Sequence, residues 1–224
     1  MRMSRPFAHR VRCLLTLAVA GACFSIPSAR AADLGEQIRA VKASRSEVEL
    51  RQRLEQLGFS RGLVDKAAAV KDAYGKAVFK LGFLKRAEMW DVNLDPDADN
   101  ERVVQVLLQS PAEMMQFTSV YLILALDAQV QGGKVLTELV FELAGCDYIG
   151  DKTMTLGFAP VPKKKYKEVR FEVKEATSCG TTVEAVSRRD VLLWNEKSGR
   201  LEVSRGKGKS TGSVDRMKAA TDDE

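Results

Sequence analysis

The chain has 224 residues, of which 29% are charged, with 35 Lys and Arg against 30 Asp and Glu and a single histidine. The excess of five positive charges lies entirely in residues 1–31. This segment has no acidic residue and five basic residues: Arg2, Arg5, Arg10, Arg12 and Arg30. Residues 32–224 therefore carry no net charge. Their overall charge gives no reason to expect a nucleic acid or an anionic lipid as partner. Their length suits one domain with a sizeable core.

Residues 1–31 have the features of a secretory signal peptide. A basic stretch precedes the short apolar run Cys13–Phe24, and Ala29-Arg30-Ala31 fits an A-x-A cleavage site. The run is too short to cross a membrane, so we expect no transmembrane span in the mature chain. The sequence thus predicts an exported protein, periplasmic or extracellular. The alternative is a lipoprotein box at Ala20-Gly-Ala-Cys23, which would make Cys23 a lipid-anchored N-terminus.

Cleavage after residue 31 also removes His9, the only histidine of the chain. A mature protein without imidazole excludes Ser-His-Asp and Cys-His catalysis and every zinc site that uses histidine. Two of the four cysteines lie in the same segment, which leaves Cys146 and Cys179. One cysteine pair in an exported protein predicts a structural disulfide, and a reactive thiol pair is disfavoured because the spacing is not C-x-x-C.

Residues 32–84 predict a helical segment, because apolar residues recur there every three or four positions. The stripes consist of Leu34, Ile38, Val41, Leu50, Leu54, Leu57, Leu63, Val64, Ala67, Val70, Tyr74 and Ala77. Ser46 and Ser60 fit the N-caps of a second and a third helix, and Gly58 fits a left-handed C-cap. We expect the third helix to run as far as Gly82 and the stripes to form a core.

From Lys85 onward the apolar period changes to two, the spacing typical of strands. Extended segments are expected at Arg102–Gln109, Phe117–Leu126, Lys134–Leu143, Met154–Phe158, Tyr166–Glu175, Thr181–Trp194 and Arg200–Ser204. Phe117–Leu126 is apolar on both faces, as a central strand is. The sequence therefore predicts an α+β fold, in which N-terminal helices pack on a mostly antiparallel β domain, residues 85–204, of about seven strands.

The last stretch, residues 205–224, is rich in Gly, Ser and charged residues and has almost no large apolar residue. This composition predicts a disordered tail. Its first part, Arg205-Gly-Lys-Gly-Lys209, carries three cations that can contact a polyanion, and a solvated tail is the alternative.

The strongest candidate for chemistry is an acidic stretch between Trp90 and Arg102. Oxygen-bearing side chains stand at every second position, and the complete set is Asp91, Asn93, Asp95, Asp97, Asp99 and Glu101. Carboxylates this close together repel one another unless they point into water or converge on a cation. Alternating carboxylates in one loop suit Ca²⁺, which takes about six to eight oxygen ligands at about 2.3–2.6 Å.

The spacing resembles the D-x-[DN]-x-D-G-x-x-D calcium loop of FG-GAP and VCBS repeats, over about sixteen residues from Asp91 to Val106. This resemblance implies a structural Ca²⁺ bound between two strands, and the single copy excludes a propeller of such repeats. Pro96 stands where these loops carry Gly, and Arg102 stands where an EF-hand carries its bidentate Glu, so an EF-hand is disfavoured. The alternative to a cation site is a solvated acidic turn.

An enzyme without histidine would need paired carboxylates, a Ser-Lys pair or a metal. The sequence contains no Gly-rich phosphate loop and no nucleophile elbow, and Glu138 and Glu142 are spaced like the wet side of a sheet. We therefore expect a noncatalytic exported module with a binding or structural role, a protein or envelope-surface partner and no nucleic acid. The alternatives are a histidine-free hydrolase that acts on glycans through carboxylates, and a lipid-anchored envelope protein.

Overall fold

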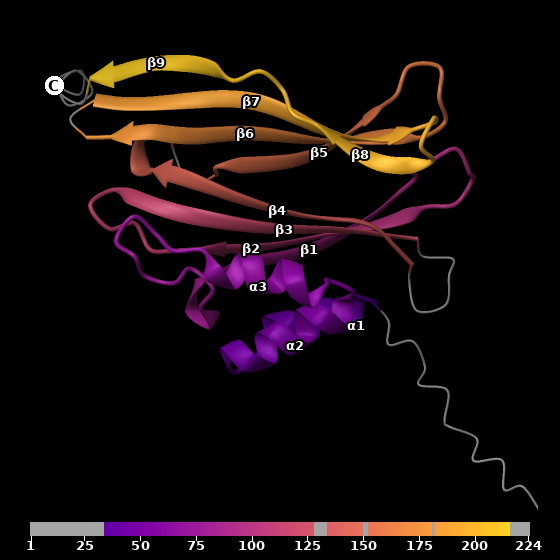
Figure 1. Cartoon of the computed structure of the whole chain (residues 1–224), viewed down its shortest axis with the longest axis horizontal. Helices are drawn as coiled ribbons and strands as arrows, with labels where there is room; N and C mark the ends of the chain where they lie inside the picture. The colour runs from indigo at the N-terminus through magenta and orange to yellow at the C-terminus, as the bar shows by residue number, and fades with distance from the viewer. Residues whose placement is uncertain (1–33, 128–133, 150–151, 181, 216–224) are drawn as a thin grey trace, which may run out of the picture. The chain divides into compact units, whose positions relative to one another are not determined.

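The structure is a computed structural model that describes residues 34–127, 134–149, 152–180 and 182–215. The predicted signal peptide, residues 1–31, and the lipoprotein box at Cys23 lie outside the described residues, as do residues 216–224 of the predicted tail. All described residues belong to one unit, Ala31–Glu224, whose elements are labelled in Figure 1.

Three helices and a 3-10 turn open the described chain: α1 (Leu34–Lys42), α2 (Glu47–Leu57), α3 (Arg61–Ala69) and η1 (Leu81–Phe83). A second 3-10 turn, η2 (Asp147–Ile149), follows the fourth strand. The predicted caps are confirmed: Ser46 Oγ accepts from the N–H of Glu49 at 3.1 Å, and Gly58 ends α2 with φ 112°. Ser60 caps α3 by accepting from the N–H of Leu63. None of the helices in the described ranges has both the length and the apolarity needed to cross a membrane.

The third helix is shorter than the sequence analysis predicts. α3 ends at Ala69, and a tight turn follows in which Gly75 has φ 76°. The side chain of Asp72 accepts from the N–H groups of Tyr74 and Lys76, both at 2.9 Å. Val70 already has an extended backbone, with ψ 133°, and the local hydrogen bonds of Asp72 offer the chain an alternative to the helix.

Nine strands in the described residues form two antiparallel sheets (Figure 1). The first sheet has the order β1-β2-β3-β4, with β1 (Leu84–Val92), β2 (Glu101–Gln109), β3 (Gln116–Asp127) and β4 (Lys134–Cys146). The second has the order β5-β6-β7-β8, with β9 also paired to β7, and consists of β5 (Met154–Pro160), β6 (Lys167–Cys179), β7 (Thr182–Asn195), β8 (Arg200–Ser204) and β9 (Lys209–Asp215). The α+β class is confirmed, but two sheets replace the predicted single sheet.

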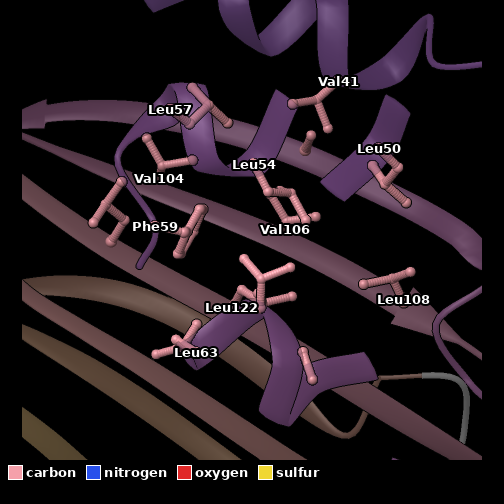
Figure 2. Packing of buried hydrophobic residues seen from close by; sticks show 14 of the residues in the cluster. Val41, Leu50, Leu54, Leu57, Phe59, Leu63, Val104, Val106, Leu108 and Leu122 are labelled. Carbon is pink, nitrogen blue, oxygen red and sulfur yellow. The ribbon is translucent and has the colours of Figure 1, made fainter. Parts of the chain in front are cut away.

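Two hydrophobic cores lie on opposite faces of the first sheet. One joins the three helices to alternate residues of β2 and β3, among them Val104 and Leu122 (Figure 2). The other joins the intervening residues, among them Val103 and Ile123, to the second sheet. The layers are therefore helices, first sheet and second sheet (Figure 1), and the segment Phe117–Leu126 is buried on both faces as predicted.

The assignment of residues 205–224 to a disordered tail does not hold for Lys209–Asp215, which forms β9. This strand pairs with the N-terminal half of β7, between Thr182 and Ser187. β8 pairs only with the C-terminal half of β7, between Val191 and Asn195, so the remaining edge of β7 is open to another strand. Backbone pairing to an open edge needs little apolar side chain, which is why composition did not reveal β9.

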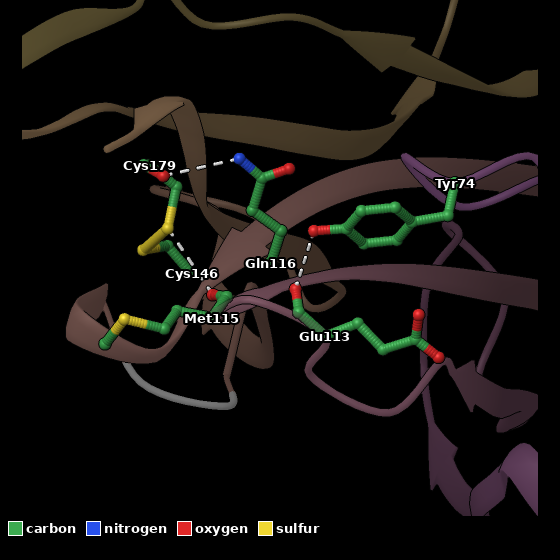
Figure 3. Close-up of a disulfide and its surroundings, with 6 residues drawn as sticks. All are labelled: Tyr74, Glu113, Met115, Gln116, Cys146 and Cys179. Carbon is green, nitrogen blue, oxygen red and sulfur yellow. Dashed lines mark hydrogen bonds between the residues drawn. A yellow bond between two sulfur atoms is a disulfide. The ribbon is translucent and has the colours of Figure 1, made fainter.

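The predicted disulfide is present and connects the two sheets. Cys146 is the last residue of β4 and Cys179 the last of β6, and their Cα atoms are 6.0 Å apart. Next to it, Gln116 Nε2 donates to the carbonyl of Cys179 at 3.4 Å (Figure 3). Tyr74 donates its hydroxyl to the carbonyl of Glu113 at 3.1 Å, so the turn after α3 contacts the same end of β3.

Candidate metal centre

The acidic stretch forms the hairpin loop between β1 and β2. The two strands stay in register up to the pair Val92 and Glu101, so the loop begins at Asn93. The carbonyl of Asn93 accepts a hydrogen bond at 2.9 Å from the N–H of Lys167, the first residue of β6. The loop is thus fixed to the second sheet as well as to the first.

Three of the six predicted ligands converge in this loop. Carboxylate oxygens of Asp95, Asp97 and Glu101 all lie within 4.8 Å of one another. Two oxygens that bind the same Ca²⁺ are at most about 5 Å apart, because each Ca–O distance is about 2.3–2.6 Å. Glu101 is only 2% exposed and Asp97 is exposed, so the cluster has a buried base and an open side.

Two carboxylates of the cluster, those of Glu101 and Asp95, lie in an environment that disfavours negative charge. Burial raises the pKa of Glu101 to about 7, with a further contribution from the charges of Asp95 and Asp97. A hydrogen bond that Glu101 accepts from the N–H of Leu94 acts in the opposite direction. Burial and the charges of Asp97 and Asp127 also raise the pKa of Asp95. A bound cation supplies the positive charge that compensates these groups.

Asn93 adds a neutral oxygen to the same loop. Its Nδ2 donates to the carbonyl of Asp97 at 2.7 Å, which holds the side chain inside the loop. Its Oδ1 is buried and accepts no hydrogen bond from the described residues. A buried carbonyl oxygen without a donor is unfavourable, and amide oxygens are common Ca²⁺ ligands, so this atom fits a cation site.

Asp91 and Asp99 are not brought into the cluster. Asp91 Oδ1 pairs with Nε of Arg102 at 3.3 Å across the hairpin. Asp99 donates its N–H to Oδ1 of Asp97 at 2.9 Å, and Asp97 donates its own N–H to Asp95 at 3.0 Å. These hydrogen bonds join each residue to the one two positions away and form Asx turns, which the interpretation as a solvated acidic turn expects. Asx turns and converging carboxylates therefore occur in the same loop.

Sequence reasoning missed Asp127, which raises the pKa of Asp95 through its charge. Asp127 ends β3 and lies opposite Glu101 in the register of β2 and β3. A short antiparallel connection brings the end of the third strand back to the start of the second. The prediction that β2 and β3 form an antiparallel hairpin could therefore have indicated that Asp127 lies near the acidic loop.

Glu138 and Glu142, which the sequence places on the wet side of a sheet, differ in their surroundings. Glu138 Oε2 accepts from the N–H of Ser60 at 2.7 Å, and Glu138 Oε1 accepts from the Ser60 hydroxyl. Glu138 therefore completes the N-terminus of α3, whereas Glu142 is exposed. Within the described ranges, Asp95 and Glu101 are the carboxylates whose pKa is raised, so the acidic loop is the best candidate site.

Comparison of the chain with protein-family models, with curated proteins and with solved structures found no match. The likeness of the loop to FG-GAP and VCBS calcium loops therefore stays a prediction from the sequence. Function has to be argued from the site, since a fold by itself does not define one.

Proposed function

We propose that the protein is a noncatalytic exported module with a binding or structural role, stabilised by one Ca²⁺ in the loop between β1 and β2. The observation that carries the proposal is the convergence of Asp95, Asp97 and Glu101 within 4.8 Å. A supporting observation is that Oδ1 of Asn93, in the same loop, is buried and has no hydrogen-bond partner among the described residues. Its partner is a protein or an envelope surface.

Calcium fits this set better than magnesium does. Ca²⁺ accepts an irregular shell of carboxylate, amide and water oxygens, whereas Mg²⁺ needs near-octahedral geometry and keeps most of its water. The open side at Asp97 leaves room for water ligands. Export is supported by the sequence of residues 1–31 and by the cystine between Cys146 and Cys179, which is compatible with an oxidising compartment.

The cation would act on stability, because it joins residues that are separated along the hairpin. Glu101 begins β2, whereas Asp95 and Asp97 lie in the loop that β6 holds through Lys167. A ligand that binds the folded chain and not the unfolded chain raises the free energy of unfolding by mass action. At a concentration of about one hundred times Kd this gain is about 2.7 kcal/mol.

Thermal melting of the mature protein in Ca²⁺, in Mg²⁺ and in chelator tests the proposal. We expect saturating Ca²⁺ to raise the melting temperature by about 5–10 °C and Mg²⁺ to raise it less. Asp95→Asn should abolish the response. Asp91→Asn is the matched control, since it removes the same charge from the same hairpin but from outside the cluster.

If the cluster binds the cation, Asp95→Asn loses the calcium response and Asp91→Asn keeps it. Identical melting curves in Ca²⁺ and in chelator would leave the solvated acidic turn as the explanation of this stretch. A calcium response that Asp95→Asn keeps and Asp91→Asn loses would place the cation elsewhere in the loop.

A further inference from the structure

A basic groove lies on the second sheet and shares no residue with the acidic loop. It has a volume of about 670 Å³ and is lined by residues of β5, β6, β7 and β9, by Lys152 before β5 and by the connection from β8 to β9. One acidic residue, Glu172, lines it, against six basic residues: Lys152, Lys174, Arg188, Arg189, Lys207 and Lys209. Because residues 32–224 are neutral as a whole, this excess of cations is local.

Four of these cations have no partner among the described residues. Arg189 is paired with Glu172 at 2.9 Å, which neutralises the only acid of the lining. Arg188 is paired with the buried Asp190 at 3.2 Å and with Glu175 at 3.0 Å. The four lysines make no ion pair with any residue that the structure describes, and three of them are exposed while the lysine on β6 is half-buried.

The connection between β8 and β9 is fixed tightly against β7. The N–H of Gly206 donates to Oδ1 of the buried Asp190 at 3.0 Å. A Cβ atom on Gly206 would lie 2.1 Å from the carbonyl oxygen of Arg189, and one on Gly208 would lie 2.6 Å from Cγ1 of Val186. Both positions therefore favour glycine, and the lysines that follow each of them line the groove. The alternation of Gly and Lys thus has a structural cause.

We propose that this groove binds an anionic polysaccharide. Clustered ammonium groups that have no ion-pair partner in the described ranges attract a chain that carries repeated sulfate, phosphate or carboxylate groups. The hydroxyl groups of Thr155 and Ser187 line the same groove and can exchange hydrogen bonds with sugar hydroxyls. The described lining contains no aromatic side chain, so the stacking platform that single-stranded nucleic acids use is missing.

This binding surface goes beyond the proposed function and does not depend on the cation centre. The groove is an open surface on the strands rather than an enclosed pocket, which suits an extended polymer. Its cations come from three strands, β6, β7 and β9, and from two connections, so only the folded second sheet brings them together. An anionic polysaccharide can therefore bind whether or not the acidic loop holds Ca²⁺.

Fluorescence anisotropy with a fluorescein-labelled heparin oligosaccharide, a sulfated polysaccharide, tests the proposal on the mature protein. The groove variant combines Lys174→Ala, Lys207→Ala and Lys209→Ala. The control variant removes three exposed lysines from the helical region: Lys42→Ala, Lys66→Ala and Lys71→Ala. At about 0.1 M salt we expect Kd to rise about tenfold in the groove variant and less than about twofold in the control.

Each outcome of this experiment decides the proposal. An equal loss of heparin affinity in the two variants would show that heparin responds to the overall charge of the protein, and this result would overturn the proposal. Tighter binding of an oligo-dT of equal charge than of heparin would overturn it in favour of a nucleic acid. Lys207→Glu, at one exposed position, repeats the test if the triple variant does not fold. The calcium response of melting should be the same in all variants, which separates this test from that of the cation centre.

Discussion

Glu101 is the first residue of β2, and the alternation of side chains along the strand decides where its carboxylate lies. Glu101 and Val103 point to the same face, which is the core between the two sheets. Asp91 lies opposite Arg102, one step out of phase, and so points to the other face of the hairpin. The spacing of the acidic residues in the sequence predicted that all of them form one cluster. Only the register of the strands shows that Glu101 belongs to the cluster and that Asp91 does not.

The buried position of Glu101 predicts how metal-free protein responds to pH. Its pKa is raised from 4.5 to about 7, so the folded chain holds this proton more tightly than the unfolded chain does. The resulting stability is complete below pH 4.5 and is lost as pH rises through about 7. In chelator we expect the melting temperature to fall by about 3–6 °C over this range, or about 1–2 kcal/mol after allowance for solvent screening.

Glu101→Gln is the control for this prediction, because the amide has the shape of the protonated acid and does not titrate. Its melting temperature should fall less over the same range of pH, and the fall that remains comes from Asp95, whose pKa burial also raises. Hydrogen bonds lower the pKa of Glu49, Glu196 and Glu202, so the stability from these groups is lost only as pH falls below about 4.5. A decrease in Glu101→Gln as large as that of the unchanged protein would assign the pH dependence to another group.

Helices α2 and α3 show which parts of an element can be predicted from neighbouring residues. In α2, Ser46 caps the first turn, and Glu49 reaches back to accept from the N–H of Arg45 at 2.9 Å. In α3 the corresponding position is Leu63, which has no acceptor. Glu138 of β4 supplies the acceptor from 78 residues away, so the sequence revealed the cap but not its partner.

Glu138→Ala should therefore lower the free energy of unfolding by about 1–2 kcal/mol. The change leaves the N–H and the hydroxyl of Ser60 without their acceptor, and it removes a negative charge from the N-terminus of α3. Urea unfolding measures the difference. Glu142→Ala is the matched control, since Glu142 is exposed on the same face of β4, and its effect should stay within about 0.5 kcal/mol. Equal effects would mean that Glu138 contributes no more than an ordinary surface residue.

Strand positions were easier to predict than sheet membership. The predicted segments at Arg102–Gln109 and Phe117–Leu126 agree with β2 and β3 to within one residue at each end. β1 was missed, because Lys85, Arg86 and Glu88 interrupt its alternation. An apolar residue at every second position shows that a strand has a face buried in a core. It does not show which of two cores that face contacts, so the sequence could not assign the strands to two sheets.

The two sheets share a core, and each contains one of the two tryptophans of the chain. Trp90 lies on β1, and its ring packs edge-on against Phe158 of β5 with centroids 5.9 Å apart. Trp194 lies on β7. Fluorescence of Trp194→Phe therefore reports on the first sheet, and fluorescence of Trp90→Phe reports on the second. We expect both variants to melt in a single transition at nearly the same temperature, because neither sheet keeps its inner face buried without the other.

Removal of the disulfide separates the contribution of the core from that of the covalent link. Adding Cys146→Ser and Cys179→Ser to each single-tryptophan variant opens a loop closed by residues 33 apart and should lower the free energy of unfolding by about 3–4 kcal/mol. The melting temperatures reported by the two tryptophans should fall by the same amount, since the buried residues between the sheets remain. Two separate transitions in the serine variants would instead mean that the disulfide, and not the shared core, makes the sheets unfold as one.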